Sequence, residues 1–221
     1  MNAHSSQLPL HSRRGFTLVE MAVVMVIIGA ILYGLLQSRS VISSARAKDI
    51  VAMINDMHTA TTYFQQRYGY LPGDLPNPAT YISAVPALVA GTGGTIGNGS
   101  IEGAVNAAGA AAAGSEVAQA PWQLYNAGLI GSVNAAAPTA YLSTVYGPVQ
   151  LVSAATAGTF VPGFVAANPM ARNAILFFSL PCDVATEVDT KIDDGKITSG
   201  SAQGSAVCTG TNTLAVYAVP L

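Results

Sequence analysis

The chain has 221 residues, a formal net charge of −2 and only 9 % charged residues, against a hydrophobic fraction of 51 %. This low charge density excludes a highly charged disordered protein, and the scattered lysines and arginines give no basic patch for binding a nucleic acid. Three histidines and two cysteines, with no catalytic motif around them, argue against an enzyme and against a histidine-rich metal site.

The amino terminus divides into a short polar segment and a long apolar one. Residues 1–15 include Arg13 and Arg14, contain no acidic residue and end in Gly15, whereas residues 16–36 are almost continuously apolar. At about 1.5 Å per residue, a helix over the apolar segment is long enough to cross the hydrocarbon core of a membrane. A secretory signal places its small cleavage residue after the apolar segment, but here Gly15 precedes it. Cleavage after Gly15 would therefore leave the apolar helix on the mature protein.

One acidic residue, Glu20, interrupts the apolar segment near its start. A carboxylate inside a membrane helix is unfavourable and usually has a partner. Thr17 and Glu20 have the spacing of a capping box, and the helix dipole favours an acid in the first turn. The residues alone leave two interpretations open: Glu20 caps its own helix, or it pairs with a group outside that helix.

The string RRGFTLVE at residues 13–20 closely resembles the leader junction of type IV prepilins and type II secretion pseudopilins. The resemblance implies that a prepilin peptidase cleaves between Gly15 and Phe16 and methylates the new amine of Phe16. It also implies that the mature chains assemble into a filament through their apolar helices. In such a filament the Phe16 amine of a neighbouring subunit would neutralise Glu20.

The same resemblance implies a set of partners and a location. The partners are other pilin-like subunits in a homo- or hetero-oligomeric filament, the prepilin peptidase, the inner-membrane assembly machinery and the membrane itself. The amino terminus would be cytoplasmic and the remainder periplasmic or, after assembly, at the cell surface. A type IV pilus subunit and a type II secretion pseudopilin are both compatible with the motif. A monomeric membrane-tethered binding module with an uncleaved anchor is the alternative of a different class.

The helical pattern continues beyond the apolar segment. Apolar residues recur at helical spacing with polar residues between them, which predicts one helix over residues 16–67; these apolar residues are Ile50, Met53, Ile54, Met57, Ala60 and Phe64. Gly69 is suited to end this helix, and Pro72 and Gly73 predict a turn after it. The predicted organisation is a leader over residues 1–15, the long helix over residues 16–67, and a globular head over residues 68–221.

The first part of the head is rich in Ala, Gly, Ser and Thr. We expect loops around residues 90–106 and a helix over residues 115–127 that Gly128 caps, with Pro121 marking either its true start or a kink. Trp122, Leu124 and Tyr125 are interpreted as core residues rather than binding residues.

The second part of the head contains the strand candidates. Runs rich in β-branched and aromatic residues, bounded by Gly, Pro or Asn, predict strands at residues 149–152, 160–166, 174–180 and 214–219. One long helix packed on an antiparallel sheet of about four strands is an α+β fold, and the pilin resemblance implies the same architecture.

Cys182 and Cys208 lie near the carboxyl terminus. Two cysteines in one exported domain most often pair, and closing this loop would stabilise the head by about 3 kcal/mol. Two buried thiols are the alternative. The resemblance to pilins also implies a disulfide here.

Between these cysteines the sequence predicts a short helix that ends at Gly195. Val184, Val188 and Ile192 form its buried stripe, and Asp189 and Asp193 are expected on a solvated face. No cofactor is expected. Calcium bound by Asp189, Asp193 and Asp194 is a less favoured alternative, because the spacing lacks the EF-hand pattern.

Overall fold

The computed structural model describes residues 15–84, 86–134, 139–209 and 212–221, and of residues 36–40 it describes the backbone alone. The predicted leader therefore lies outside the described residues except for Gly15. The helices are α1 (Leu18–Tyr68), α2 (Pro78–Tyr81), α3 (Glu116–Asn126), α4 (Ala154–Phe160), α5 (Phe164–Ala167) and α6 (Cys182–Ile192). The strands are β1 (Leu142–Ser143), β2 (Pro148–Ser153), β3 (Asn173–Pro181), β4 (Gln203–Gly204) and β5 (Thr213–Pro220).

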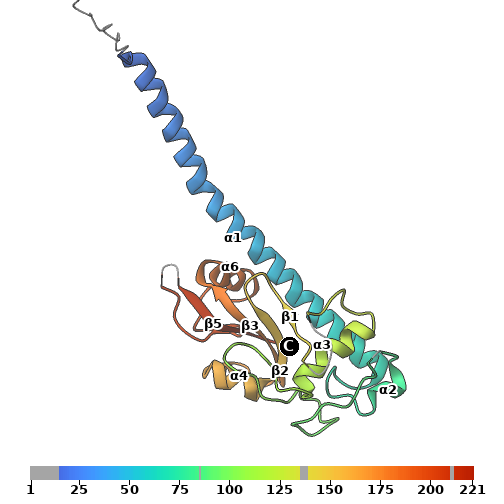
Figure 1. Cartoon of the computed structure of the whole chain (residues 1–221). Coiled ribbons are helices and arrows are strands. Elements are labelled where there is room, and N and C mark those ends of the chain that lie inside the picture. Colours follow the sequence, from blue (N-terminus) through green and yellow to red (C-terminus); the bar gives the residue numbers. More distant parts are fainter. Residues whose placement is uncertain (1–14, 85, 135–138, 210–211) are drawn as a thin grey trace, which may run out of the picture. The chain divides into compact units, whose positions relative to one another are not determined.

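The long helix predicted from the apolar periodicity is confirmed as α1 (Figure 1). It ends at Tyr68 and is followed by Gly69, which has a φ of 77° and donates its backbone N–H to the Gln65 carbonyl at 2.8 Å. A left-handed residue after the last turn is the usual way for a helix to stop. The chain divides into two compact units between Ile42 and Ser43, so the last part of α1 belongs to the head.

The head contains a five-stranded antiparallel sheet in the order β1-β2-β3-β5-β4. Three predicted strands are confirmed as β2, β3 and β5. Val149 pairs with Phe177, and Phe177 pairs with Tyr217, so these side chains share one face of the sheet. With the helix α1, the sheet makes an α+β pilin-like fold, as expected.

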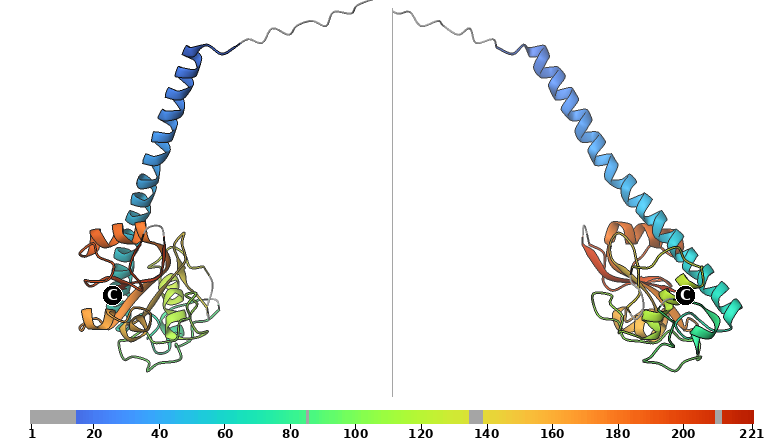
Figure 2. Two further views of the ribbon diagram at one scale, coloured as in Figure 1. Left: turned by 90° about the vertical axis from the view of Figure 1, so that its left-hand side faces the viewer. Right: turned by 45° about the vertical axis from the view of Figure 1, so that its right-hand side comes forward.

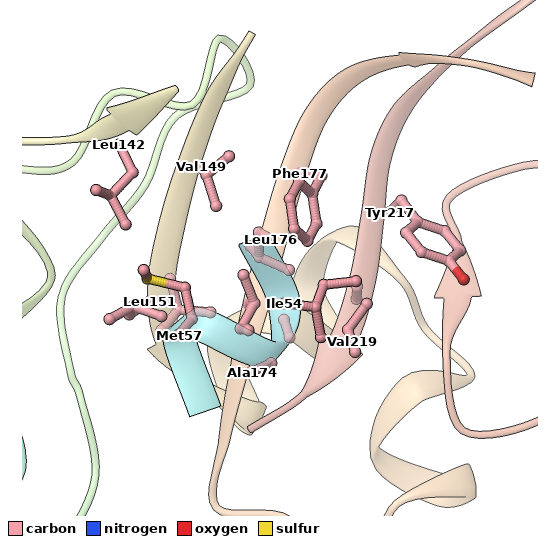
Figure 3. Close-up of a cluster of buried hydrophobic side chains, with 14 of the residues drawn as sticks. Ile54, Met57, Leu142, Val149, Leu151, Ala174, Leu176, Phe177, Tyr217 and Val219 are labelled. Carbon is pink, nitrogen blue, oxygen red and sulfur yellow. The ribbon is translucent and has the colours of Figure 1, made fainter. Parts of the chain in front are cut away.

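Both faces of the sheet are covered by helices. Figure 3 shows Ile54 and Met57 of α1 among apolar side chains of β2, β3 and β5. The rings of Phe160 in α4 and Phe178 in β3 meet edge to face, with their centroids 5.7 Å apart. Figure 2 shows α6 beside the segment of α1 that follows Ser43, where the Ser44 hydroxyl donates to Glu187 Oε1 at 2.5 Å. The core of the head is therefore assembled around the carboxyl-terminal half of α1.

One predicted strand is wrong. Residues 160–166 contain the end of α4, a turn and most of α5 instead of a strand. Ser153 starts α4 by accepting a hydrogen bond from the Thr156 backbone N–H at 3.2 Å, and Pro162 and Gly163 then interrupt the chain before α5. A helix cap and a Pro-Gly turn thus override the β-forming side chains of this segment.

The predicted helix at residues 115–127 is confirmed as α3. Ser115 accepts a hydrogen bond from the Ala118 backbone N–H at 3.3 Å, and Gly128 follows the helix with a φ of 73°. Pro121 lies inside the helix and is not its start. Trp122 and Leu124 are buried as expected, but Tyr125 is 40 % exposed, which corrects its assignment to the core.

Candidate assembly site

The amino-terminal unit presents an apolar helix with no covering element among the described residues. Every described side chain from Phe16 to Leu35 is exposed, and the span Leu18–Leu35 has a mean hydropathy of 2.4. A helix that is apolar on all sides is stable in lipid or against other apolar helices, not in water. Among the described residues this is one helix whose length and composition suit a membrane span.

The proposed cleavage junction lies just before this helix. Gly15, Phe16 and Thr17 are exposed and non-helical, and α1 begins at Leu18. The peptide bond between Gly15 and Phe16 is therefore free of helical hydrogen bonds on an exposed segment. This placement fits the predicted cleavage and methylation at Phe16, which stay predictions.

The capping-box interpretation of Glu20 is confirmed by the local hydrogen bonds. Glu20 Oε2 accepts from the Thr17 backbone N–H at 2.7 Å and from the Thr17 hydroxyl at 2.9 Å. In return, the Glu20 backbone N–H donates to Thr17 Oγ1 at 3.2 Å. Both bonds from Thr17 go to the same carboxylate oxygen, and a carboxylate can accept about four hydrogen bonds in all. The cap therefore leaves Glu20 able to accept from a second group, and its pairing with a neighbouring Phe16 stays a prediction.

The predicted disulfide is confirmed. Cys182 and Cys208 are bonded to each other, and their Cα atoms are 5.4 Å apart. Cys182 is the first residue of α6 and is buried, whereas Cys208 follows β4 and is half-buried. The bond therefore ties the start of α6 to the chain segment that leads into β5.

The expected solvated face of α6 is wrong at Asp189. This residue is fully buried, and its Oδ1 accepts a hydrogen bond from the Tyr217 hydroxyl at 2.7 Å. Burial raises the pKa of Asp189, and the hydrogen bond from Tyr217 offsets part of that rise. Sequence spacing alone could not find this pair, because Tyr217 comes from β5 on another part of the chain.

The other two calcium candidates are also engaged within the protein. Asp193 Oδ2 accepts from the Ala202 backbone N–H at 2.9 Å. Asp194 accepts from the Lys196 backbone N–H at 2.8 Å and from the Ser199 hydroxyl at 2.7 Å, and the Ser199 bond is the main reason why the pKa of Asp194 is lowered. Within the described part of the chain, no three acidic, histidine or cysteine side chains gather in a way that suits a metal ion. These bonds show the three carboxylates in structural roles, and calcium binding stays an untested alternative.

A groove of about 840 Å³ in the head runs between α1 and the loops around β1. Asp49, Asp56 and Arg46 are its charged lining residues, and the guanidinium of Arg46 lies 5.7 Å from the ring centroid of Tyr146. No histidine lines this groove among the described residues, so its hydroxyl side chains have no imidazole base beside them. The groove therefore offers a surface that carries both carboxylate and guanidinium groups.

Comparison with known proteins gives one result. A model of the prokaryotic N-terminal methylation motif matches residues 10–35, and this match contains the Gly15–Phe16 junction and Glu20. No curated protein and no solved structure matches the chain significantly. Proteins with this motif are structural subunits, and the motif agrees with the exposed apolar helix and its capped start. The chain thus carries, at residues 10–35, the amino-terminal methylation signature of type IV pilins and pseudopilins.

Proposed function

We propose that this chain is the precursor of a structural subunit of a type IV pilus or a related pseudopilus. The observation that carries the proposal is the methylation motif on an exposed apolar helix. The first turn of this helix is capped by the bonds between Thr17 and Glu20. The helix would anchor the precursor in the inner membrane and would become part of the filament interior after assembly. Either environment removes the apolar surface of the helix from water. In the single chain this surface is exposed, which is unfavourable in water.

The first step in this proposal is cleavage between Gly15 and Phe16 by a prepilin peptidase, followed by methylation of the Phe16 amine. The exposed, non-helical backbone at this junction supports access by the peptidase. The capping box survives the cut, because Thr17 keeps its backbone N–H when Phe16 becomes the terminal residue. The mature helix would therefore start with its cap intact and with a positive charge one residue before Thr17.

The second step is pairing of that amine with Glu20 of a neighbouring copy. A carboxylate already held by Thr17 has a fixed position, which lowers the entropy lost when a cation binds it. In an apolar filament interior an ion pair is strongly favoured over two separate charges. Pairing between copies would thus favour one axial position of each helix relative to its neighbour, the position that brings the Phe16 amine beside Glu20.

Two substitutions, one at each residue of the capping box, separate this role from simple capping. Glu20→Gln keeps the capping-box geometry, because glutamine also serves at this position, but it removes the negative charge. Thr17→Ala keeps the charge and removes the two capping-box bonds of the Thr17 hydroxyl, while the Thr17 backbone N–H stays. We expect Glu20→Gln to abolish filaments with a normal amount of subunit in the membrane, and Thr17→Ala to assemble at a reduced level. Filament yield would be measured in sheared cell-surface fractions and by electron microscopy.

Normal filament yield from Glu20→Gln would contradict the pairing step. The amino terminus of the mature protein tests the wider proposal, and mass spectrometry should find N-methyl-Phe16. Finding an intact Met1 in the membrane fraction of cells with an active prepilin peptidase would instead favour the monomeric, membrane-tethered binding module.

A further inference from the structure

A glycine-rich loop over residues 91–103 is held by hydrogen bonds to neutral groups, such as that from the Ile101 backbone N–H to Asn173 Oδ1 at 2.8 Å, and also by bonds to three acidic side chains. Asp74 accepts from the backbone N–H groups of Gly97 and Gly99, with a distance of 2.7 Å to Gly99. Glu102 Oε2 accepts from the Thr95 backbone N–H at 2.8 Å within the loop. Glu116 Oε2 accepts from the Glu102 backbone N–H at 2.7 Å. Carboxylates from three different parts of the chain thus contribute to the hydrogen bonds of the loop.

Glu116 differs from the other two acids in its surroundings. It is the first residue of α3 and, like Asp74, it is buried, but unlike Asp74 it has one carboxylate oxygen, Oε1, with no hydrogen-bond partner among the described residues. Gln119, one turn further along α3, is also fully buried with both amide atoms unpartnered. The site is tightly closed, since a Cβ built on Gly91 would lie 2.5 Å from Glu116 Cγ.

The charged groups that act on Glu116 are both negative. Asp74 approaches it from the segment after α1, and Glu102 approaches from the loop itself. α3 contributes the neutral Gln119, and Arg172 instead donates to the Asn98 carbonyl at 2.9 Å on the outer part of the loop. A negative charge on Glu116 would therefore be buried beside two acids with one oxygen unpaired, which is strongly unfavourable.

We propose that Glu116 is a proton-dependent latch for the loop of residues 91–103. With a proton bound, the Glu116 side chain is neutral and can stay buried in the closed loop, where its Oε2 accepts from the Glu102 backbone N–H. When the proton leaves, the buried charge is relieved by admitting water, which requires the loop to move away from α3. Ile101, which is fully buried in the closed loop, would then become accessible.

The expected pH range follows from the burial of Glu116. Burial, with Asp74 and Glu102 adding to it, raises the pKa of Glu116 from 4.5 to about 7. A group with a raised pKa in the closed state stabilises that state at low pH, and this contribution is lost as the pH rises through about 7. The open fraction should therefore increase about tenfold between pH 6 and pH 8 if Glu116 regains its ordinary pKa in the open state.

Amide hydrogen exchange of the full chain in detergent micelles tests the latch. After correction for the intrinsic pH dependence of exchange, protection of residues 91–103 should fall about tenfold from pH 6 to pH 8. Glu116→Gln, which cannot ionise, should keep the same protection at both pH values. Glu187→Gln is the matched control, because the Glu187 side chain accepts from Ser44 and Lys191, and it should respond to pH like the unmodified chain.

A second measurement needs no variant. The carbon-13 shift of the Glu116 carboxyl group should titrate near pH 7 in the unmodified chain. A midpoint near 4.5, or equal protection of the loop at pH 6 and pH 8, would overturn the latch. The latch concerns the head alone, so loss of filaments in Glu20 variants leaves it unaffected.

Discussion

At the scale of single residues, buried carboxylates distinguish this head from a simple apolar core. Asp189 is fully buried on α6 and is held by Tyr217 of β5, while its Oδ2 has no partner among the described residues. Removing an ionised carboxylate from water without full pairing disfavours its charged form. Asp189 therefore links the stability of the head to pH.

Asp189→Asn should become more favourable relative to the parent chain as the pH rises. Burial raises the pKa of Asp189 above its ordinary value. The protonated Asp189 therefore stabilises the folded state at low pH, and this contribution is lost as the pH rises through the pKa of Asp189 in the folded state. Asparagine cannot ionise, yet its Oδ1 can still accept from the Tyr217 hydroxyl. Urea unfolding of both chains at several pH values measures the difference.

The exposed residue Asp56 provides the control for this prediction. Asp56→Asn should stay within about 0.5 kcal/mol of the parent chain at each pH. If the difference in unfolding free energy between Asp189→Asn and the parent chain is the same at every pH measured, the prediction is wrong.

At the scale of elements, α6 is connected to the head at both ends and along its side. The disulfide holds the first residue of α6, and the Tyr217 hydroxyl donates to Asp189 in the last turn of α6. Between these points the Ser44 hydroxyl of α1 donates to Glu187. The hydrogen bond from Ser44 is also the main reason why the pKa of Glu187 is lowered. α6 thus joins α1 to β5 of the sheet.

Loss of the disulfide should destabilise the head measurably. The two cysteines are 26 positions apart, and closing a loop of this size contributes about 3 kcal/mol in the chain-entropy account. The double variant Cys182→Ser with Cys208→Ser should lose about this amount of unfolding free energy in urea. The parent chain measured with a reducing agent should show the same loss, and an unchanged unfolding midpoint after reduction would contradict the prediction.

The packing of α1 on the sheet should also stabilise the head. Each buried residue of α1 should contribute to the unfolding free energy an amount similar to that of the disulfide. Ile54 is 4 % exposed and lies among side chains of β2, β3 and β5 (Figure 3). Ile54→Ala should lower the unfolding free energy by about 2 to 5 kcal/mol, because it removes buried methyl groups and leaves a cavity. The exposed neighbour Asn55 is the control, and Asn55→Ala should change stability by less than about 0.5 kcal/mol. Equal effects of the two substitutions, measured by thermal unfolding, would argue against this packing.

At the scale of the whole molecule, the chain separates into an apolar helix and a self-contained head. The buried apolar residues of the described chain begin at Ala47, whereas the side chains from Phe16 to Leu35 are exposed. The division between Ile42 and Ser43 agrees with this change. The first unit needs lipid or other copies to cover it, and the second has its own core.

A fragment of residues 43–221 should therefore fold without the amino-terminal unit. We expect it to be monomeric in aqueous buffer, to contain the disulfide, and to unfold within a few degrees of the full chain in detergent. Size-exclusion chromatography and circular dichroism measure these properties. Aggregation of the fragment, or loss of its cooperative unfolding, would show that the head depends on the first unit.

The sequence by itself determined the features that rest on local patterns. The RRGFTLVE string identified the amino-terminal methylation motif, apolar periodicity predicted α1 almost to its last residue, and β-branched runs located β2, β3 and β5. The Thr17–Glu20 capping box is also local, because its two residues lie one turn apart. Each of these features depends on residues close together in the chain, and sequence spacing therefore contains the necessary information.

Only the tertiary structure decided the features that depend on distant residues. The two-residue strands β1 and β4 are too short to show a pattern and form because β2 and β5 lie beside them. Asp189 is paired with Tyr217 of β5, and Glu116 is closed in by the glycine-rich loop. Whether a polar side chain is solvated or buried is set by what packs over it, and those partners lie far along the chain.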